Sequence, residues 1–386
     1  MKKILLVANT SWSMIKFRYG LMQKLVEEQY NVYVISPLDE HSVEIQALGC
    51  QHIHIDIDNK GASIFNDIKL TNELYKLYKI VEPDLIFHYT IKPNIYGTLA
   101  AKYANIPSIA VITGLGYTFI NDNATAKIAK LLYKNSLKHA QKVWFINHDD
   151  RRKFILERLI DKNKIDLLPS EGVNTQKFAP LDKDNDDGIF RFILIARILW
   201  DKGIGEYVEA AKIIKQKYKN VEFQLAGFLD AKNPKAISKE QVDSWVKNGY
   251  INFLGPTNNV KKFIANADCV VLPSYREGIS MILLESASMQ KPIITTNVPG
   301  CRDIVEHNGS GFLCKPKNVQ DLANQMQNLL NLSFEQRLEM GQKSRNYVQK
   351  DFDENLVIDK YLQTIHIYLN HYKAQKFILK NSVLNK

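Results

Sequence analysis

The segment SYREGISMILLES (274–286) carries two carboxylates, Glu277 and Glu285, ahead of and inside an apolar run. The run predicts a helix that begins near Gly278, so Glu277 lies at its mouth and Glu285 lies about 12 Å further along the axis. Helix amino termini offer unpaired N–H groups and a positive dipole end, which favour a diphosphate. The spacing therefore suits a nucleotide sugar, with Glu277 accepting from sugar hydroxyls and Glu285 from the ribose.

Cations must accompany such an anionic ligand. The segment ARILWDKG supplies Arg197 and Lys202 after an apolar run that predicts a strand. Alone, Glu277 is equally well explained as a complement to the helix dipole, and each cation as a solvated charge at a strand end. Glu285 is harder to explain in this way, because a carboxylate among apolar neighbours is costly to bury. The four residues together indicate a site for a nucleotide sugar, which is called the donor site below.

The elements that position these residues alternate between short β-rich runs and helical patterns, which predicts βαβ units. We expect two doubly wound α/β domains in tandem, with ligands at the carboxyl ends of the strands. The polar segment LDKDNDDG (181–188) is expected to link them, which gives domains 1–180 and 189–352. A final helix, about 353–372, is expected to pack back on the first domain, and the tail 373–386 has no assignment. The expected strands are 3–9, 31–36, 52–57, 83–89, 107–113, 142–147 and 164–170, followed by 190–197, 221–227, 251–255, 269–274, 292–296 and 311–314.

Composition narrows the class of protein. The chain has 386 residues, more than one hydrophobic core usually supports, and a formal charge of +10, which suggests an anionic partner. Nucleic acid is disfavoured because no zinc-finger, RNP-type or basic-zipper pattern is present. The four cysteines are widely scattered, so neither a disulfide framework nor a zinc site is expected. The start lacks a cleavage-site pattern and the longest uncharged stretch, 108–121, is too short to span a bilayer, which favours a cytoplasmic protein.

The pairing of AR…DKG with PSYREGISMILLE resembles the retaining glycosyltransferases of family four, and so do EGVNTQKFAP (171–180) and PGCRDIVEHNGSGFLC (299–314). The resemblance implies the GT-B architecture, in which two Rossmann-like domains face each other across a cleft. It also implies that the carboxyl-terminal domain binds the donor, the amino-terminal domain binds the acceptor, and no metal is required.

Residue by residue, the resemblance implies that Arg197 and Lys202 hold the donor diphosphate and stabilise the leaving group. Glu277 would contact the donor sugar and Glu285 the ribose. Backbone amides would add to the donor contacts, namely those of Gly278, Ile279 and Ser280. A competing motif, Asp56-Ile57-Asp58, has the spacing of metal-dependent transferases, but no other ligand lies nearby in the sequence, and a solvated loop at a strand end is the favoured interpretation.

The sequence indicates less clearly which residues would bind the acceptor. The segments YTIKPNIYG (89–97) and ITGLGYTF (112–119) resemble bacterial N-acetylgalactosaminyltransferases that act on polyprenyl-diphosphate-linked glycans. The first turn, ANTSWSMIKFRYG, lacks the paired glycines of many family members. The acceptor candidates are Ser13, Arg18, His88, Lys92 and Gly114. Arg18 and Lys92 are expected to face an anionic acceptor, whereas His88 is equally well explained as a core histidine.

The segment NATAKIAKLLYKNSLKHAQK predicts a basic amphipathic helix. It carries Lys127, Lys130, Lys134 and Lys138 at helical spacing. Such a helix can bind an anionic membrane leaflet, although a solvated helix face would look similar.

The sequence thus predicts a retaining enzyme that moves a hexose or N-acetylhexosamine from a nucleotide diphosphate sugar, expected to be UDP-linked, to a lipid-linked glycan on the inner face of the bacterial inner membrane. The alternatives are a GT-B nucleotide-sugar epimerase and a noncatalytic nucleotide-binding partner of a membrane complex. A dinucleotide oxidoreductase is disfavoured, because GxGxxG is missing from both first turns. The sugar, the base, the linkage and the oligomeric state stay open.

Overall fold

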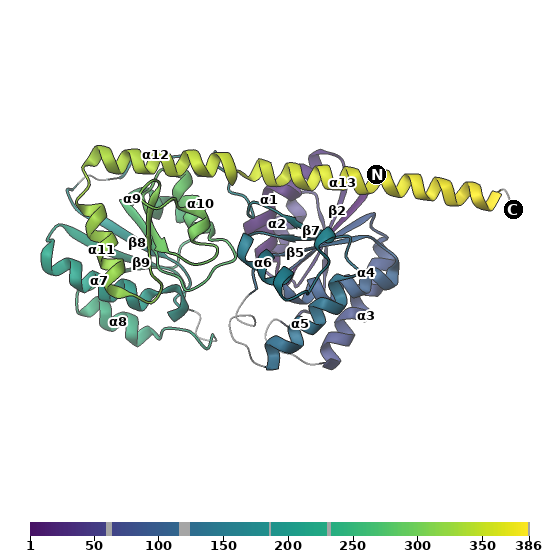
Figure 1. The fold of residues 1–386 in the computed structure, drawn as a ribbon, viewed down its shortest axis with the longest axis horizontal. Coiled ribbons are helices and arrows are strands. Elements are labelled where there is room, and N and C mark those ends of the chain that lie inside the picture. The colour runs from purple at the N-terminus through teal and green to yellow at the C-terminus, as the bar shows by residue number, and fades with distance from the viewer. Residues whose placement is uncertain (59–63, 116–123, 185–186, 230–232, 385–386) are drawn as a thin grey trace. The chain divides into compact units, whose positions relative to one another are not determined.

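The chain folds into two α/β units, which are described separately below (Figure 1). The computed structural model describes residues 1–58, 64–115, 124–184, 187–229 and 233–384. Unit 1 comprises residues 1–172 and 355–386, and unit 2 comprises residues 173–354. The prediction of two doubly wound domains is confirmed, but the expected boundary at 181–188 is wrong, because this segment lies inside unit 2.

Unit 1 is built on a seven-stranded parallel sheet in the order β3-β2-β1-β4-β5-β6-β7. The central strands, such as β4 and β5, are buried along their whole length, as expected for parallel strands that are covered on both faces, whereas the edge strands β3 and β7 are partly polar and less buried. The strands are β1 (Lys3–Val7), β2 (Asn31–Ser36), β3 (Gln51–His54), β4 (Leu85–Tyr89), β5 (Ser108–Ile112), β6 (Lys142–Phe145) and β7 (Ile165–Leu167). The helices are α1 (Ser11–Glu27), α2 (Ser42–Ala47), α3 (Ile64–Val81), α4 (Thr98–Ala104), α5 (Ala124–Leu137) and α6 (His148–Leu156), with the π-helix η1 (Pro93–Gly97) and the 3₁₀ turn η3 (Lys162–Lys164).

The long helix α13 (Glu354–Leu384) returns to unit 1 (Figure 1). It buries Tyr361, Ile365 and Leu369, which recur every four residues and form one apolar stripe. The Tyr361 ring lies 4.9 Å from the ring of Phe87 and 4.9 Å from that of Trp144, measured between centroids. Aromatic packing therefore holds the final helix on the sheet of unit 1.

Unit 2 contains a six-stranded parallel sheet in the order β10-β9-β8-β11-β12-β13. The strands are β8 (Phe190–Ile195), β9 (Val221–Ala226), β10 (Asn252–Gly255), β11 (Cys269–Leu272), β12 (Ile293–Thr296) and β13 (Gly311–Cys314). The helices are α7 (Ile204–Lys217), α8 (Lys239–Lys247), α9 (Val260–Asn266), α10 (Met281–Ser288), α11 (Val319–Leu330) and α12 (Phe334–Asp351), with the 3₁₀ turns η4 (Trp200–Lys202) and η5 (Arg302–Ile304). All thirteen expected strands are confirmed.

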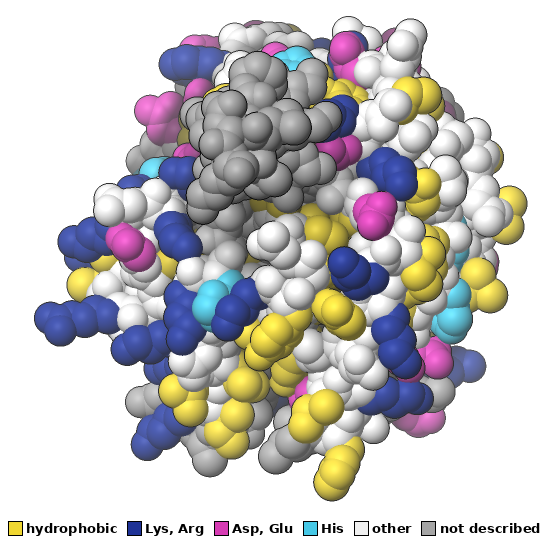
Figure 2. Space-filling model, turned by 90° about the vertical axis from the view of Figure 1, so that its right-hand side faces the viewer, with side chains coloured by type: hydrophobic (Ala, Val, Ile, Leu, Met, Phe, Trp, Pro, Cys, Tyr) yellow, Lys and Arg dark blue, Asp and Glu magenta, His cyan; other side chains and the backbone are white. Residues whose placement is uncertain are grey.

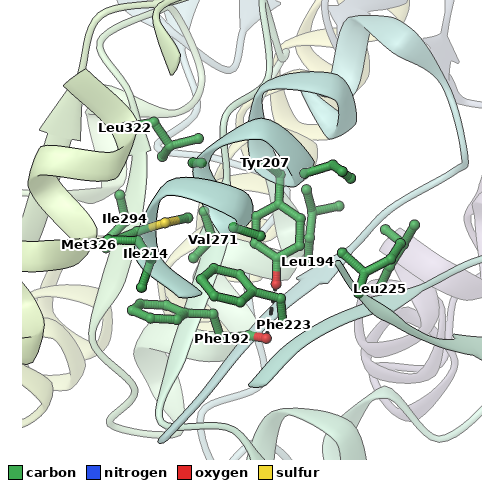
Figure 3. Close-up of a cluster of buried hydrophobic side chains, with 14 of the residues drawn as sticks. Phe192, Leu194, Tyr207, Ile214, Phe223, Leu225, Val271, Ile294, Leu322 and Met326 are labelled. Carbon is green, nitrogen blue, oxygen red and sulfur yellow. Dashed lines mark hydrogen bonds between the residues drawn. The ribbon is translucent and has the colours of Figure 1, made fainter. Parts of the chain in front are cut away.

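One core cluster of unit 2 lies between the sheet and helix α7 (Figure 3). The rings of Phe192 and Phe223 stack with their centroids 5.1 Å apart, and Tyr207 packs edge-on against Phe223. The buried Tyr207 hydroxyl donates to the carbonyl of Phe192 at 2.9 Å, so its polar end is satisfied. This packing fixes α7, and with it the turn η4 that precedes it.

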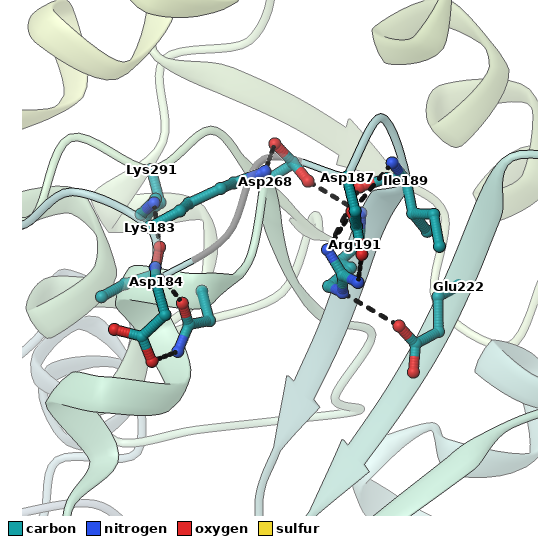
Figure 4. Close-up of polar contacts among 10 residues, drawn as sticks. Lys183, Asp184, Asp187, Ile189, Arg191, Glu222, Asp268 and Lys291 are labelled. Carbon is teal, nitrogen blue, oxygen red and sulfur yellow. Dashed lines mark hydrogen bonds and ion pairs between the residues drawn. The ribbon is translucent and has the colours of Figure 1, made fainter.

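Polar contacts explain why the acidic segment 181–188 belongs to unit 2 (Figure 4). Lys183 pairs with Asp268, and Arg191 pairs with both Asp187 and Glu222. Asp268 also accepts a hydrogen bond from the backbone N–H of Arg191 at 2.8 Å. The described residues of this segment, 181–184 and 187–188, therefore lie along the amino edge of this sheet instead of forming a loose linker.

Candidate active site in unit 2

Two loops of unit 2 follow adjacent strands at the point where the strand order reverses. One loop follows β8 and leads into η4, and the other follows β11 and leads into α10. In open parallel sheets this switch point, at the carboxyl ends of the strands, is where ligands bind. The predicted donor residues Lys202 and Glu277 lie on these two loops.

The structure brings Lys202 and Glu277 into direct contact. The Lys202 Nζ lies 2.5 Å from Glu277 Oε1, and their side chains are 16% and 15% exposed. The contact crosses 75 residues of sequence. A pair with this partial exposure is shielded from bulk water yet stays accessible to a ligand, and the ammonium group has two further N–H donors to offer an anion.

The glycine of the DKG segment allows this contact. Gly203 caps η4 with a φ of +72°, and a Cβ at this position would lie 2.1 Å from the carbonyl oxygen of Pro273. The backbone of the first loop therefore passes directly against the second loop. The Tyr275 N–H adds a hydrogen bond to the Asp201 carbonyl at 2.9 Å. Lys202 is thus presented by a turn that only glycine can close.

The loop that carries Glu277 rests on the turn after β12. The Glu277 N–H donates to the Pro299 carbonyl at 3.1 Å, and the Ser280 N–H donates to the Gly300 carbonyl at 3.0 Å. Gly300 has a φ of +74°, and a Cβ there would lie 2.6 Å from the carbonyl oxygens of both Glu277 and Gly278. The Pro299-Gly300 turn therefore supports the backbone of the donor loop, a role that the sequence reasoning missed although a Pro-Gly pair after a strand is a turn signal.

The expected start of the helix needs a correction. Helix α10 begins at Met281 and not near Gly278, so Glu277 lies in the preceding loop and the axial spacing of about 12 Å does not apply. The amide of Ser280 is engaged by Gly300, and its expected role toward the donor is therefore wrong. Glu285 is inside the helix as predicted and is 3% exposed.

The remaining donor candidates keep their predicted positions. Arg197 lies two residues past the end of β8, and its side chain is exposed. Gly278 and Ile279 are half-buried in the loop beside Glu277. Burial, followed by the negative charge of Glu277, raises the pKa of the Cys301 thiol well above its usual range. Cys301 therefore stays a neutral thiol behind the ion pair.

Comparisons with known proteins decide the family. A family model described as glycosyl transferases group 1 matches residues 174–347, and one described as glycosyl transferase 4-like matches residues 3–147. An N,N'-diacetylbacillosaminyl-diphospho-undecaprenol alpha-1,3-N-acetylgalactosaminyltransferase from Campylobacter jejuni is 30% identical over 369 residues, which cover 91% of this chain and 95% of the relative. The chain therefore belongs to the glycosyltransferases of the group 1 and 4-like families. The predicted enzyme class is confirmed, and the epimerase and noncatalytic alternatives find no support.

A further relative and a solved structure are also similar to this chain. The UDP-Gal:alpha-D-GlcNAc-diphosphoundecaprenol alpha-1,3-galactosyltransferase of Escherichia coli is 27% identical over 317 residues, or 78% of this chain and 80% of the relative. The solved structure of Anabaena HepE, in complex with UDP and glucose, is similar with a TM-score of 0.76 at 16% identity, covering 95% of this chain and 100% of HepE. The structural likeness confirms the predicted GT-B fold class.

On the acceptor side of this glycosyltransferase, Arg18 is not available to a ligand. It is 4% exposed, its Nη2 lies 2.8 Å from Glu171 Oε1, and its guanidinium lies 3.8 Å from the centroid of the Tyr89 ring. Burial raises the pKa of Glu171, and the charge of Arg18 opposes this rise. The prediction that Arg18 faces an anionic acceptor is therefore wrong: it forms a structural ion pair.

His88 is a core histidine, the alternative that the sequence left open. It is fully buried, and its Nε2 lies 2.9 Å from the Tyr78 hydroxyl. Burial lowers its pKa to about 3, so the ring is neutral. Gly97 makes room for it, because a Cβ there would lie 2.6 Å from the imidazole. His88 therefore does not contact an acceptor.

Lys92 keeps its place at the carboxyl edge of the sheet. Its Nζ lies 2.9 Å from Asp67 Oδ1, and Tyr96 donates to the other oxygen of Asp67 at 2.7 Å. Just before it, Thr90 has a φ of +69°, a strained value for a β-branched residue. Strain of this kind and π-helical turns such as η1 are both frequent at functional sites. Lys92 is therefore the acceptor candidate with the strongest structural setting.

The other two acceptor candidates are Ser13 and Gly114. Ser13 lies in the first turn of helix α1, where its N–H donates to the capping Thr10 side chain at 3.2 Å and its hydroxyl donates to the Thr10 carbonyl at 2.8 Å. Gly114 follows β5 with a φ of +128° and is half-buried. The segment 116–123, which includes part of the ITGLGYTF motif, lies outside the described residues.

The aspartates of the competing metal motif are exposed, and Asp56 pairs with His54 at 3.2 Å. Within the ranges that the structure describes, no three His, Cys, Asp or Glu side chains gather as a metal site would require. Of the described helices, none combines the length and the apolar character needed to cross a bilayer.

Proposed function

We propose that this glycosyltransferase moves a hexose or N-acetylhexosamine from a UDP-sugar to a polyprenyl-diphosphate-linked glycan, with retention of anomeric configuration. The observation that carries the proposal is the half-buried contact between Lys202 and Glu277 at the switch point of unit 2. The names of the two relatives, which act on undecaprenyl-diphosphate-linked sugars, support the acceptor class, and the UDP-galactose in one of them supports the donor class.

The residues of unit 2 supply electrostatic stabilisation. When the bond between the anomeric carbon and the diphosphate breaks, UDP takes the electron pair and gains negative charge, which Lys202 and Arg197 stabilise. Glu277 accepts hydrogen bonds from the sugar hydroxyls and holds Lys202 in place. The acceptor hydroxyl attacks from the face that UDP leaves, and its proton passes to the departing phosphate. Two fixed cations take the electrostatic role that Mg²⁺ has elsewhere, so we propose catalysis without a metal.

The test begins with a thermal-shift panel of UDP- and GDP-sugars on the purified chain, followed by transfer to a lipid-linked acceptor with and without a chelator. Lys202→Met is expected to lower kcat by about 10²- to 10³-fold. Lys183→Met is the matched control, because Lys183 also forms a half-buried pair, with Asp268, but at the opposite edge of the same sheet. Full activity in Lys202→Met, or loss of wild-type activity on chelation, would contradict the proposed leaving-group role.

We further propose that unit 1 binds an anionic membrane, the inner leaflet of the bacterial inner membrane. Helix α5 presents Lys127 and Lys134 on its exposed surface together with Ile128 and Leu131, which are 58% and 59% exposed. Lys138 follows the end of the helix, whereas Lys130 pairs with Glu157 at 3.2 Å and contributes less.

Helix α3 adds to this surface. Near its start, Phe65 and Ile68 are more than half exposed. Viewed from the side on which α3 and α4 lie, hydrophobic side chains gather beside Lys and Arg toward the lower end of the face (Figure 2). Exposed apolar groups beside lysines are the composition of an interfacial membrane contact.

Vesicle sedimentation tests this proposal. The triple variant with Lys127, Lys134 and Lys138 changed to Glu is expected to lose most binding to vesicles that contain phosphatidylglycerol, since each basic residue near an anionic surface contributes about 1 kcal/mol. The charge-matched control changes three exposed lysines of unit 2 to Glu, namely Lys239, Lys247 and Lys350. Equal binding by both triple variants would refute the role of α5.

A further inference from the structure

Unit 2 contains a hollow of about 540 Å³ that is lined in part by residues of the two donor loops, Trp200 and Tyr275. It lies between the first turns of α7 and helix α8 and is lined by aromatic and polar side chains, among them Trp200, Glu206, Glu209, Gln241, Trp245 and Tyr275. Its volume is within the usual range of small-molecule sites, about 300 to 1,000 Å³. Trp245 belongs to the core cluster of unit 2, whereas the other five of these side chains have no part in the donor chemistry or the core packing described above.

The aromatic groups are arranged with one ring open to solvent. Trp200 is 41% exposed and meets the buried Trp245 edge-on, with the ring centroids 5.9 Å apart. Gly205 lies against the Trp200 ring, because a Cβ there would lie 3.1 Å from it. The indole is thus supported from behind while a large part of its surface stays uncovered. An ordered, half-exposed tryptophan is a platform for an apolar face of a ligand.

Charge in the hollow is balanced. Glu209 pairs with Lys212 at 2.7 Å, and Glu206 accepts a hydrogen bond from the Tyr275 hydroxyl at 2.7 Å. The ammonium of Lys317 lies 4.8 Å from the centroid of the Tyr275 ring. Two carboxylates are therefore matched by two ammonium groups. A phosphate would meet the carboxylates and a free cation would meet the lysines, so neither charge class is favoured.

What remains is a neutral ligand with an apolar face and many hydroxyls. A pyranose has this chemistry: its C–H face can pack on an indole ring, and its hydroxyls can bond carboxylate and amide groups such as Glu209 and Gln241. We propose that this hollow is a glycan-binding site, distinct from the donor site, that holds one or two neutral sugar residues on Trp200. It would let a glycosyltransferase of lipid-linked glycans retain a glycan chain beside its active site.

The hollow and the donor site share their supporting backbone. The turn η4 carries Trp200 into the hollow and Lys202 into the donor site, and the loop after β11 carries Tyr275 into the hollow two residues ahead of Glu277. The two sites are therefore adjacent, but different side chains line each of them. This makes it necessary to separate sugar binding in the hollow from sugar binding in the donor site.

Binding is measured with N-acetylglucosamine oligomers of one to four residues by saturation-transfer NMR and by tryptophan fluorescence, in the presence of saturating UDP. Glycerol at equal concentration is the control for a nonspecific polyol effect. We expect saturable binding that UDP does not displace and that Trp200→Ala weakens about tenfold or more. Glu209→Gln, a milder variant, is expected to weaken it by a smaller factor.

Trp12→Ala is the matched control, because Trp12 is 46% exposed, similar to Trp200, but belongs to unit 1. It is expected to bind the oligomers like wild type. The proposal is overturned if no saturable binding occurs, if UDP displaces the sugar, or if Trp200→Ala binds normally while keeping its UDP-induced thermal shift. None of these readouts depends on transfer activity, so the result is independent of the proposed function.

Discussion

Gly300 offers a sharp test of how the donor loop is held. Its φ of +74° is in the left-handed region, which costs an L-residue about 1 to 2 kcal/mol. In Gly300→Ala the new Cβ would also lie 2.6 Å from the carbonyl oxygens of Glu277 and Gly278, whereas ordinary contacts begin near 3.4 Å and real ones are almost never under 3.0 Å. Both oxygens are backbone atoms, so the loop that carries Glu277 has to retreat.

The retreat implied by these distances is about 0.4 to 0.8 Å, and a displacement of about 1 Å in a catalytic group can cost about 10²-fold in rate. We therefore expect Gly300→Ala to lower kcat/KM by about 10- to 100-fold, or about 1.4 to 2.7 kcal/mol in transition-state stabilisation. The assay is transfer of sugar to a lipid-linked acceptor, with unfolding followed in parallel by thermal denaturation.

The control variant Gly249→Ala separates the effect of backbone strain on stability from the effect of loop displacement on activity. Gly249 has a φ of +69°, and a Cβ there would meet no atom within 4 Å. It follows α8, away from the donor loops. Both variants are expected to lower the melting temperature by a few degrees, since about 1 kcal/mol shifts a domain of this size by about 2 to 4 °C. Near-wild-type kcat/KM in Gly300→Ala, or an equal loss in Gly249→Ala, would refute the argument.

Three further outcomes are expected. Glu285→Gln should weaken UDP binding in a thermal-shift titration but leave binding of 2′,3′-dideoxy-UDP unchanged. The reason is that UDP has the ribose diol that Glu285 is expected to bind, whereas the dideoxy analogue lacks it. Equal losses of binding for both ligands would contradict this role of Glu285. Burial lowers the pKa of His88 from its ordinary value of about 6.5 to about 3, so its contribution to stability is complete above pH 6.5 and is lost as the pH falls toward 3. Denaturant unfolding from pH 7 to 4 should therefore show wild type losing up to about 3 kcal/mol relative to His88→Gln. Arg18→Met or Glu171→Gln alone should destabilise the chain by about 3 to 5 kcal/mol by leaving a buried charge, and the double variant should recover part of this loss in the same unfolding assay.

Most strands could be read from the sequence because they are short apolar runs buried on both faces, such as β4 and β11. Helices α4, α6 and α8 were not predicted, and α8 shows why. It is short and mostly polar, and it buries only Val242 and Trp245. The signal that marks its start is the cap, in which the Ser238 side chain accepts from the N–H of Gln241. Its low apolar content hid a helix that capping would have revealed.

The proximity of Lys202 and Glu277 could be predicted because both residues belong to recognisable segments at strand ends. The supports of that pair could not be predicted, because their role depends on backbone distances. Gly203 matters through Pro273, and Gly300 matters through Glu277, and in each case the glycine is required by a carbonyl oxygen that lies far away in the sequence. Similarly, nothing near Arg18 in the sequence reveals its partner, which is 153 residues away.

Access to solvent separates two ion pairs whose cations were both expected to face an anionic ligand, Arg18 the acceptor and Lys202 the donor. Arg18 lies within helix α1 and Lys202 lies in the turn η4, and both pair with a glutamate. The side chains of Arg18 and Glu171 are 4% and 8% exposed, and a ring covers the guanidinium, so a ligand would have to displace buried structure to reach them. Lys202 and Glu277 keep about twice that exposure or more, and glycines hold their loops in place. A charged pair that is fixed by backbone yet partly open can bind a ligand, whereas a pair that is sealed can only stabilise the fold. This difference in burial is why we propose an active site in unit 2 around Lys202 and not around Arg18.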